Sequence, residues 1–293
     1  MLFPNLWPAA RTGQRWLLNA RRRVTTVDGH RMVYLERGHP RPGRPTVVLI
    51  HGFASMKENW ALWLQALPRH WHLLVPDLPG LGESDYRVEA CYRYQSQAQR
   101  LNTWLEQQPA GDLHLAGSSM GGAIAAILAH HLATPPRSLT LLNSAGIPEQ
   151  PDRSPDAPFQ SDRDQILIPR DWRGVYRMFN SVGNGRPSVL GVAMTGLLGP
   201  DLLGRTRALE HIFRDMLADP LAPARYLGKD TPPMQVQWGD RDTITPTRCV
   251  RWFERATPGA ELHLFPGVGH LPMVEVPRRS ASVFARFVAR HQP

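Results

Sequence analysis

Short, almost continuous apolar runs recur along most of the chain and alternate with segments in which apolar residues repeat at helical spacing. The apolar runs cover residues 46–50, 72–77, 113–117, 139–143, 234–238 and 261–265. Runs of this kind are typical of strands buried on both faces, as in a parallel sheet. Helical spacing is found at residues 58–66, 92–107, 120–132, 245–256 and 274–290. With a hairpin that turns at Asp28 and Gly29, this order predicts an open, mostly parallel α/β sheet flanked by helices.

The alternation stops between residues 147 and 233. This segment begins with the proline-rich, charged stretch PEQPDRSPDAPFQSDRD and continues with helix-like patches such as DWRGVYRMFNSV and RTRALEHIFRDMLA. A loop of about 85 residues without secondary structure is unusual in a compact domain. We therefore expect a helical insertion at 147–233, a core formed by 24–146 and 234–293, and an N-terminal arm at 1–23.

Charge and cysteine content narrow the classes of function. The net charge of +9 comes almost entirely from arginines scattered along the 293 residues, and no nucleic-acid-binding motif accompanies them. We expect a solvated basic surface and no nucleic-acid partner. The two cysteines, Cys91 and Cys249, are far apart and lack metal-ligand spacing, so no metal site is expected.

The N-terminal arm places tryptophans and leucines, among them Trp7, Trp16 and Leu17, between arginines. No apolar run approaches the ~20 residues that cross a bilayer, and prolines and arginines interrupt the apolar region that a signal peptide needs. Two interpretations stay open, because such an arm can lie in a membrane interface or pack on its own domain. Either one indicates a cytoplasmic or peripheral membrane protein.

The stretch LHLAGSSMGGAIAAILAHHLA, residues 113–133, begins as a strand, ends as a helix and has two serines at the junction. Ser119 is bracketed by Gly117 and Gly121 in the pattern G-x-S-x-G, and Ser118 lacks this bracket. In that pattern a sharp turn lifts the serine hydroxyl above the sheet, and the following helix offers free N–H groups. Ser119 is therefore the candidate nucleophile.

A serine hydroxyl needs a base, and two later segments supply a histidine and a carboxylate. His270 follows the run 261–265 in FPGVGHLPMVEVP, and Asp240 and Asp242 follow the run 234–238 in WGDRDTITP. Loops after parallel strands are where such sheets build their sites. The chain order of serine, aspartate and histidine predicts a hydrolase triad of Ser119, His270 and one of the two aspartates.

Two backbone N–H groups are expected to form an oxyanion hole. One belongs to Met120, directly after the nucleophile. The other comes from LIHGFASMKENW, which contains the end of the run 46–50, with Phe53 as the expected donor and Ala54 as the alternative. We expect His51 to form structural hydrogen bonds rather than to act as a second base.

The motifs HGF, DLPGLGESD, GSSMGG, WGDRDTITP and GVGHLPMVEVP occur in this order, and the chain from His30 onward resembles a serine hydrolase of the α/β-hydrolase fold. HGFASMKENW and NSAGI are most similar to the monoacylglycerol lipase and esterase branch. The family's G-x-x-D pattern selects Asp242 as the partner of His270, and Asp240 is then expected to shape the loop or pair with an arginine. The resemblance also implies that the 147–233 insertion is a lid.

The resemblance implies a cofactor-free carboxylic ester hydrolase that acts on short-to-medium acyl esters through an acyl-enzyme. The insertion residues expected to form an acyl pocket, or else to pack the insertion on the sheet, are Met178, Phe179, Met194, Leu197 and Leu198. Two alternatives stay open: a hydrolase of carbon–carbon bonds in ring-fission products, which shares the SMGG elbow, and an inactive binding module. Ser119 argues against haloalkane dehalogenases and epoxide hydrolases, which carry an aspartate at the elbow.

Overall fold

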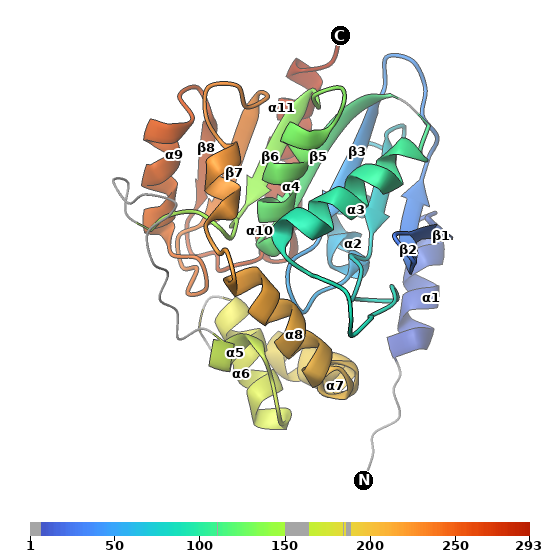
Figure 1. Cartoon of the computed structure of the whole chain (residues 1–293), viewed down its shortest axis with the longest axis vertical. Helices are drawn as coiled ribbons and strands as arrows, with labels where there is room; N and C mark the ends of the chain where they lie inside the picture. The colour runs from blue at the N-terminus through green and yellow to red at the C-terminus, as the bar shows by residue number, and fades with distance from the viewer. Residues whose placement is uncertain (1–6, 110, 150–163, 184, 186–188) are drawn as a thin grey trace.

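A computed structural model describes residues 7–109, 111–149, 164–183, 185 and 189–293, and its centre is a mostly parallel sheet with helices on both faces (Figure 1). Its strands are β1 (Arg21–Val27), β2 (His30–Arg37), β3 (Pro45–Ile50), β4 (His72–Pro76), β5 (Asp112–Ser118), β6 (Ser138–Leu142), β7 (Met234–Gly239) and β8 (Glu261–Phe265). The sheet order is β1-β2-β4-β3-β5-β6-β7-β8. Only the pairs β1–β2 and β2–β4 of this sheet are antiparallel. The α/β prediction is confirmed.

The helices within the described ranges cover the sheet and one end of it. They are α1 (Trp7–Leu17), η1 (Lys57–Trp60), α2 (Ala61–Ala66), α3 (Tyr94–Glu106), α4 (Met120–His131), α5 (Asp164–Leu167), α6 (Trp172–Val182), α7 (Val189–Gly204), α8 (Thr206–Leu217), η2 (Ala222–Tyr226), η3 (Thr247–Cys249), α9 (Val250–Ala256), α10 (Pro272–Glu275) and α11 (Pro277–Arg290). The helices α5 to α8 and η2 lie between β6 and β7 in the chain, and α5 to α8 gather below the sheet in Figure 1. The proline-rich stretch at 150–163 lies outside the described residues.

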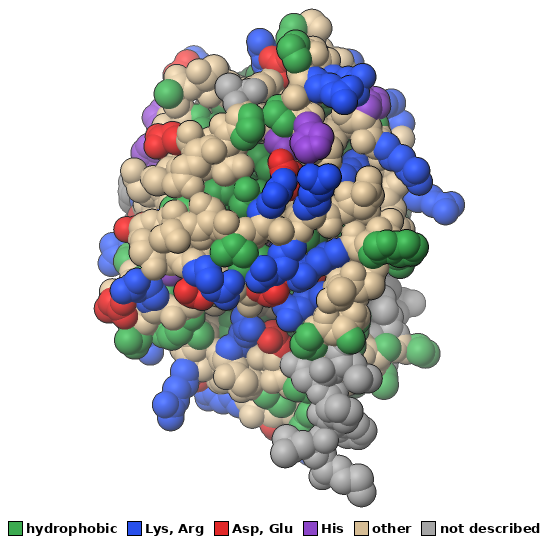
Figure 2. Space-filling view, turned by 90° about the vertical axis from the view of Figure 1, so that its right-hand side faces the viewer, with side chains coloured by type: hydrophobic (Ala, Val, Ile, Leu, Met, Phe, Trp, Pro, Cys, Tyr) green, Lys and Arg blue, Asp and Glu red, His purple; other side chains and the backbone are tan. Residues whose placement is uncertain are grey.

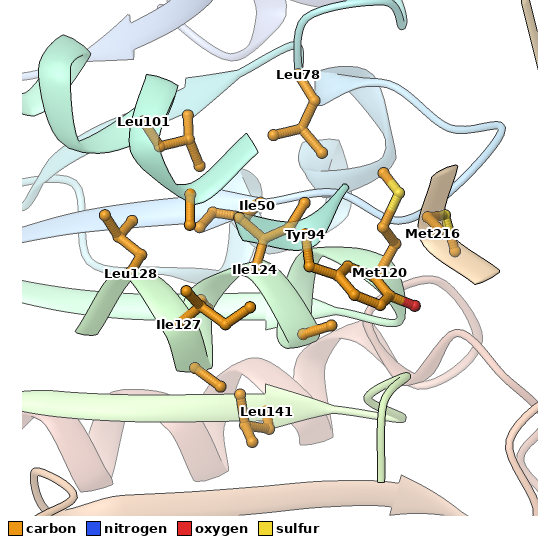
Figure 3. Packing of buried hydrophobic residues seen from close by; sticks show 14 of the residues in the cluster. Ile50, Leu78, Tyr94, Leu101, Met120, Ile124, Ile127, Leu128, Leu141 and Met216 are labelled. Carbon is orange, nitrogen blue, oxygen red and sulfur yellow. The ribbon is translucent and has the colours of Figure 1, made fainter. Parts of the chain in front are cut away.

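Two apolar clusters hold the helices against the two faces of the sheet. In β3, Val48 and Ile50 belong to the cluster under α3 and α4, which Figure 3 shows, and Val47 and Leu49 belong to the cluster under α2 and α11. Successive side chains of a strand point to opposite faces. A strand buried on both faces is therefore mostly apolar along its length, which is why these strands read as nearly continuous apolar runs, although buried polar residues such as Gln235 and Gln237 of β7 also occur.

The N-terminal arm packs on its own domain through α1. Trp7 and Leu18 are buried in the two apolar clusters, and Arg15 forms an ion pair with Glu83. The remaining described residues of the arm, 21–23, already belong to the sheet, because β1 begins at Arg21 and pairs with β2. No helix of the described residues is both long and apolar enough to span a bilayer.

Candidate active site

Ser119 occupies the sharp turn between β5 and α4. Its φ of 54° and ψ of −121° lie in a strained backbone region that a non-glycine residue seldom adopts. The turn leaves no room for side chains on its flanks, because a Cβ on Gly117 would lie 2.2 Å from Gly121 O. A Cβ on Gly121 would lie 2.2 Å from Ile50 O. The glycine bracket that singled out Ser119 therefore has a steric cause.

The two adjacent serines face different surroundings. The Ser119 side chain lines a cavity of about 590 Å³ at the carboxyl ends of the strands. Ser118 is the last residue of β5, is fully buried, and its Oγ has no hydrogen-bond partner in the described part of the chain. Only Ser119 is within reach of a substrate in this cavity.

His270 is hydrogen-bonded to Asp242, with 2.8 Å between Nδ1 and Oδ2. Both side chains are buried. Asp240 instead accepts a hydrogen bond of 2.7 Å from the N–H of Gly267 and so ties together the loops after β7 and β8. The geometry thus separates the two aspartates, with Asp242 beside the histidine and Asp240 in the loop structure.

Asp242 is held by donors that the sequence did not point to. Its Oδ1 accepts from the N–H groups of Ile244 at 2.8 Å and Thr245 at 3.0 Å, and its Oδ2 accepts from Thr245 Oγ1 at 2.6 Å and from Asn143 Nδ2. Burial raises the pKa of Asp242, but the charge of His270 and these hydrogen bonds outweigh it, so the pKa lies below its usual value. The carboxylate is therefore ionised where an imidazolium needs it.

Ser119 and His270 both line the same cavity. Among the described residues, Ser119 Oγ and His270 form no hydrogen bond with one another. Catalytic hydrogen bonds often form fully only when substrate is bound, so the absence of this bond is compatible with a nucleophile and its base.

The loop after β3 runs directly against the nucleophile. A Cβ on Gly52 would lie 3.1 Å from Ser119 Cβ, and Phe53 and Ala54 line the cavity beside it. In the described part of the chain, the N–H of Phe53 has no backbone acceptor among the loop and turn hydrogen bonds. Met120 is the first residue of α4, and the first N–H groups of a helix have no partner within it.

His51 has a structural role, as expected from the sequence. Its Nδ1 donates to Gly52 O at 2.8 Å, and its Nε2 accepts from the N–H of Leu78 at 3.0 Å. Burial lowers the pKa of His51, since a charged imidazole is costly in a site without solvent. Both ring nitrogens are occupied by the backbone, which leaves none for catalysis.

The chain was compared with known protein families, and the profile of the alpha/beta hydrolase family matches residues 47–283 of its sequence. The chain belongs to this family. It is 30% identical over 271 residues to Lipase 1 of Psychrobacter immobilis, covering 90% of this chain and 82% of the relative. It is 24% identical to the monoacylglycerol lipase ABHD6 of Bos taurus, covering 97% and 88%. A crystal structure titled as a membrane phospholipase A is similar with a TM-score of 0.86 and 28% identity, covering 98% and 91%.

These findings confirm the resemblance that the motifs indicated. Two of the relatives are named for lipase activity, which supports a hydrolase that acts on a lipid or another ester. Several other similar structures, such as a hydrolase of carbazole degradation at 19% identity, show the common fold alone.

The cavity of this alpha/beta hydrolase is walled by apolar side chains from the helices between β6 and β7. Met178 and Phe179 of α6 and Met194 and Leu198 of α7 line it, as expected. Leu197 is not among the lining residues and packs on the apolar cluster under α3 and α4, which is the second of the two roles expected for these residues. Successive helical residues point about 100° apart, so one leucine of the pair faces the cavity and the other does not.

Further residues line the cavity that the sequence did not single out. Apolar ones include Leu167, Val182, Leu202, Val268, Leu271 and Val274. Polar groups are also present, since Ser55, Asn59 and Glu275 line the same cavity. In the described residues, no cluster of His, Cys, Asp or Glu has the arrangement of metal ligands.

Proposed function

We propose that this protein is a serine carboxylic ester hydrolase. The observation that carries the proposal is the Asp242–His270 pair, whose histidine lines one apolar cavity together with the strained serine of the elbow. The similarity to lipases over most of the chain supports the same class of reaction. The residues would act as a unit, with Ser119 as nucleophile, His270 as base and Asp242 as its orienting acid.

In the proposed mechanism His270 Nε2 takes the proton of Ser119 Oγ while the oxygen attacks the ester carbonyl carbon. The π electrons of the ester carbonyl move to the carbonyl oxygen. This oxyanion accepts hydrogen bonds from the N–H groups of Phe53 and Met120. Collapse of this intermediate breaks the bond to the alcohol, which leaves with the proton from His270. Water then repeats the sequence on the acyl-enzyme and releases the acid. Asp242 holds Nδ1–H and stabilises the imidazolium.

The apolar wall supports an acyl chain as the part of the substrate that the cavity binds. Each methylene transferred from water contributes about 0.8 kcal/mol. We therefore propose short-to-medium acyl esters as substrates, with a monoacylglycerol among them. A peptide amide is not proposed, because the wall offers few polar groups for a peptide backbone.

We also propose that α1 contacts a membrane. Trp16 and Leu17 are 83% and 71% exposed at the end of this helix. Arg21, Arg22 and Arg23 follow in β1 with exposed side chains, and Figure 2 shows basic side chains in a band across this face of the molecule. An apolar tip beside arginines is suited to the interface of an anionic bilayer.

The test is a substrate panel of p-nitrophenyl esters, monoacylglycerols and a ring-fission dienone, with a fluorophosphonate probe for the nucleophile. Ester turnover and labelling are expected in the wild type and in Ser118→Ala. In Ser119→Ala labelling is lost and turnover falls by at least about 10⁴-fold. Dienone cleavage without ester turnover would favour the carbon–carbon hydrolase, and labelling of the Ser119→Ala protein would refute the assignment of the nucleophile.

A further inference from the structure

A buried cluster of charges follows the oxyanion loop in the chain. Lys57 Nζ lies 2.5 Å from Asp77 Oδ2, 2.7 Å from Glu83 Oε2 and 3.2 Å from Glu58 Oε1. From α1, Arg15 Nη2 forms an ion pair with Glu83 and lies 3.5 Å from Glu58 Oε1. The mechanism uses none of these side chains, although burying charge is costly unless the charges are well paired.

The cluster holds one end of the oxyanion loop. The N–H of Lys57 donates to Asp77 Oδ1 at 2.7 Å, and the N–H of Glu83 donates to Asp77 Oδ2 at 2.7 Å. The other end is held by His51, whose Nε2 accepts from the N–H of Leu78. Residues 52–56, which include the expected donor Phe53, therefore lie between two hydrogen-bonded anchors, Asp77 and Leu78, which directly follow β4.

Cations from α1 and β1 complete the cluster. Lys57 contacts the carboxylates of Asp77, Glu58 and Glu83. Arg11 of α1 and Arg22 of β1 each pair with Glu83, whereas Arg15 contacts both Glu83 and Glu58. Burial raises the pKa of Glu83, but its hydrogen bond and ion pair with Lys57 and the charge of Arg15 lower it to about 2. Lys57, Glu58, Asp77 and Glu83 belong to the core, so Arg15 ties α1 to two carboxylates that Lys57 also contacts.

We infer that α1 positions the oxyanion loop of the active site and that Arg15 is the residue through which it does so. Without Arg15, Glu83 and Glu58 lose a cation that they share, and Lys57, which contacts both, shifts toward them. Its backbone N–H, which anchors the loop on Asp77, moves with it, and the N–H of Phe53 leaves its position. This inference rests on the proposed function, because it concerns the oxyanion hole of that reaction.

The decisive variant is Arg15→Gln, assayed with a short, water-soluble p-nitrophenyl ester. We expect kcat to fall about tenfold, less than for complete loss of an oxyanion donor, with KM within about twofold of wild type. Fluorophosphonate labelling should slow by the same factor, because the phosphoryl oxygen occupies the same hole. Arg15→Lys should restore most of kcat. Arg137→Gln is the matched control, since it removes an exposed ion pair with Asp112 at the amino ends of β5 and β6, away from the cavity.

The double variant Arg15→Gln/Glu83→Gln tests the charge of the Arg15–Glu83 ion pair separately from the packing of α1 on the core. It removes one cation and one carboxylate together, so it should recover part of the kcat that Arg15→Gln loses. Unchanged kcat in a folded Arg15→Gln protein would overturn the inference, as would a double variant slower than the single one. These results are distinct from failure of the proposed function, in which the wild type itself shows no ester turnover or Ser119→Ala retains it.

Discussion

Two regions meet in the active-site cavity and are built in opposite ways. The loops at the carboxyl ends of the strands approach each other so closely that a Cβ on Gly239 would lie 2.0 Å from Gly269 O and one on Gly121 2.2 Å from Ile50 O. In α7, on the other side of the cavity, a Cβ on Gly196 or Gly204 would meet nothing within 4 Å. At Gly121 and Gly239 the strand loops therefore pack backbone against backbone, whereas α7 has room for a side chain at Gly196 and Gly204, although not at Gly199, where a Cβ would lie 2.4 Å from the Trp172 ring.

The two regions also differ in the interactions that they offer a substrate. The strand loops supply oriented polar groups, such as the Asp242–His270 pair with its donors Asn143 and Thr245. The helices α6 and α7 supply mainly apolar surface, including Met178 and Met194. Hydrogen bonds depend steeply on geometry, whereas apolar burial depends on area. In the proposed function, the loops would therefore carry out the reaction and the helices would select the acyl chain of the substrate.

The largest expected effect is a loss of kcat on changing a polar residue of the strand loops. Asp242→Asn should lower kcat about 10⁴-fold, because the amide no longer fixes the His270 tautomer or stabilises its charge. Steady-state kinetics with a p-nitrophenyl ester measure the loss. Asp240→Asn is the matched control and should retain far more activity, provided that both variants are folded. If Asp240→Asn lowered kcat more than Asp242→Asn, the assignment of Asp242 as the partner of His270 would be wrong.

A pair of glycine substitutions compares the packing of the two regions directly. Gly121→Ala should destabilise the protein by at least about 2 kcal/mol, since its Cβ would overlap backbone that cannot move aside. Gly196→Ala should be neutral or stabilise α7 by up to about 1 kcal/mol, because alanine is the better helix former. Denaturant unfolding measures both free energies. Equal effects of the two substitutions would remove the contrast between the regions.

The helical side of the comparison is tested by acyl-chain length. In the wild type kcat/KM should rise by up to about fourfold per methylene from acetyl to octanoyl, until the cavity is full. Met194→Ala should alter this dependence, because Met194 lines the cavity. Leu197→Ala, a nearby helical position outside the wall, should leave the slope unchanged. A flat or falling series in the wild type would remove the case for an acyl pocket but leave the esterase proposal standing.

The smallest effect concerns the outer face of α1, which contributes to neither region. Replacing Trp16 and Leu17 with serine should reduce co-sedimentation with anionic vesicles without changing turnover of a soluble ester. Binding of the wild type should also weaken as salt screens the arginines beside them. Binding that is equal for both proteins and insensitive to salt would exclude α1 as the contact.

Much of this molecule follows from local sequence patterns. A strand between two helical layers needs apolar side chains on both faces, so the runs at β3, β5 and β6 predicted the parallel sheet. The elbow was equally visible, because its two glycines bracket Ser119 within one short turn, although Gly117 is crowded by Gly121 and Gly121 by Ile50 of β3. The place of Ser119 and His270 in the cavity wall then followed from the rule that loops after parallel strands share one edge.

What the tertiary structure alone decided are contacts between residues far apart in the chain. Asn143 meets Asp242, 99 residues later, and Arg15 meets Glu83, 68 residues later, and neither pair belongs to a local pattern. Leu197 and Leu198 are identical neighbours, and only the rotation of α7 on the sheet decided which one faces the cavity. A period in the sequence shows that a residue is buried, but the partner it is buried against depends on how whole elements pack.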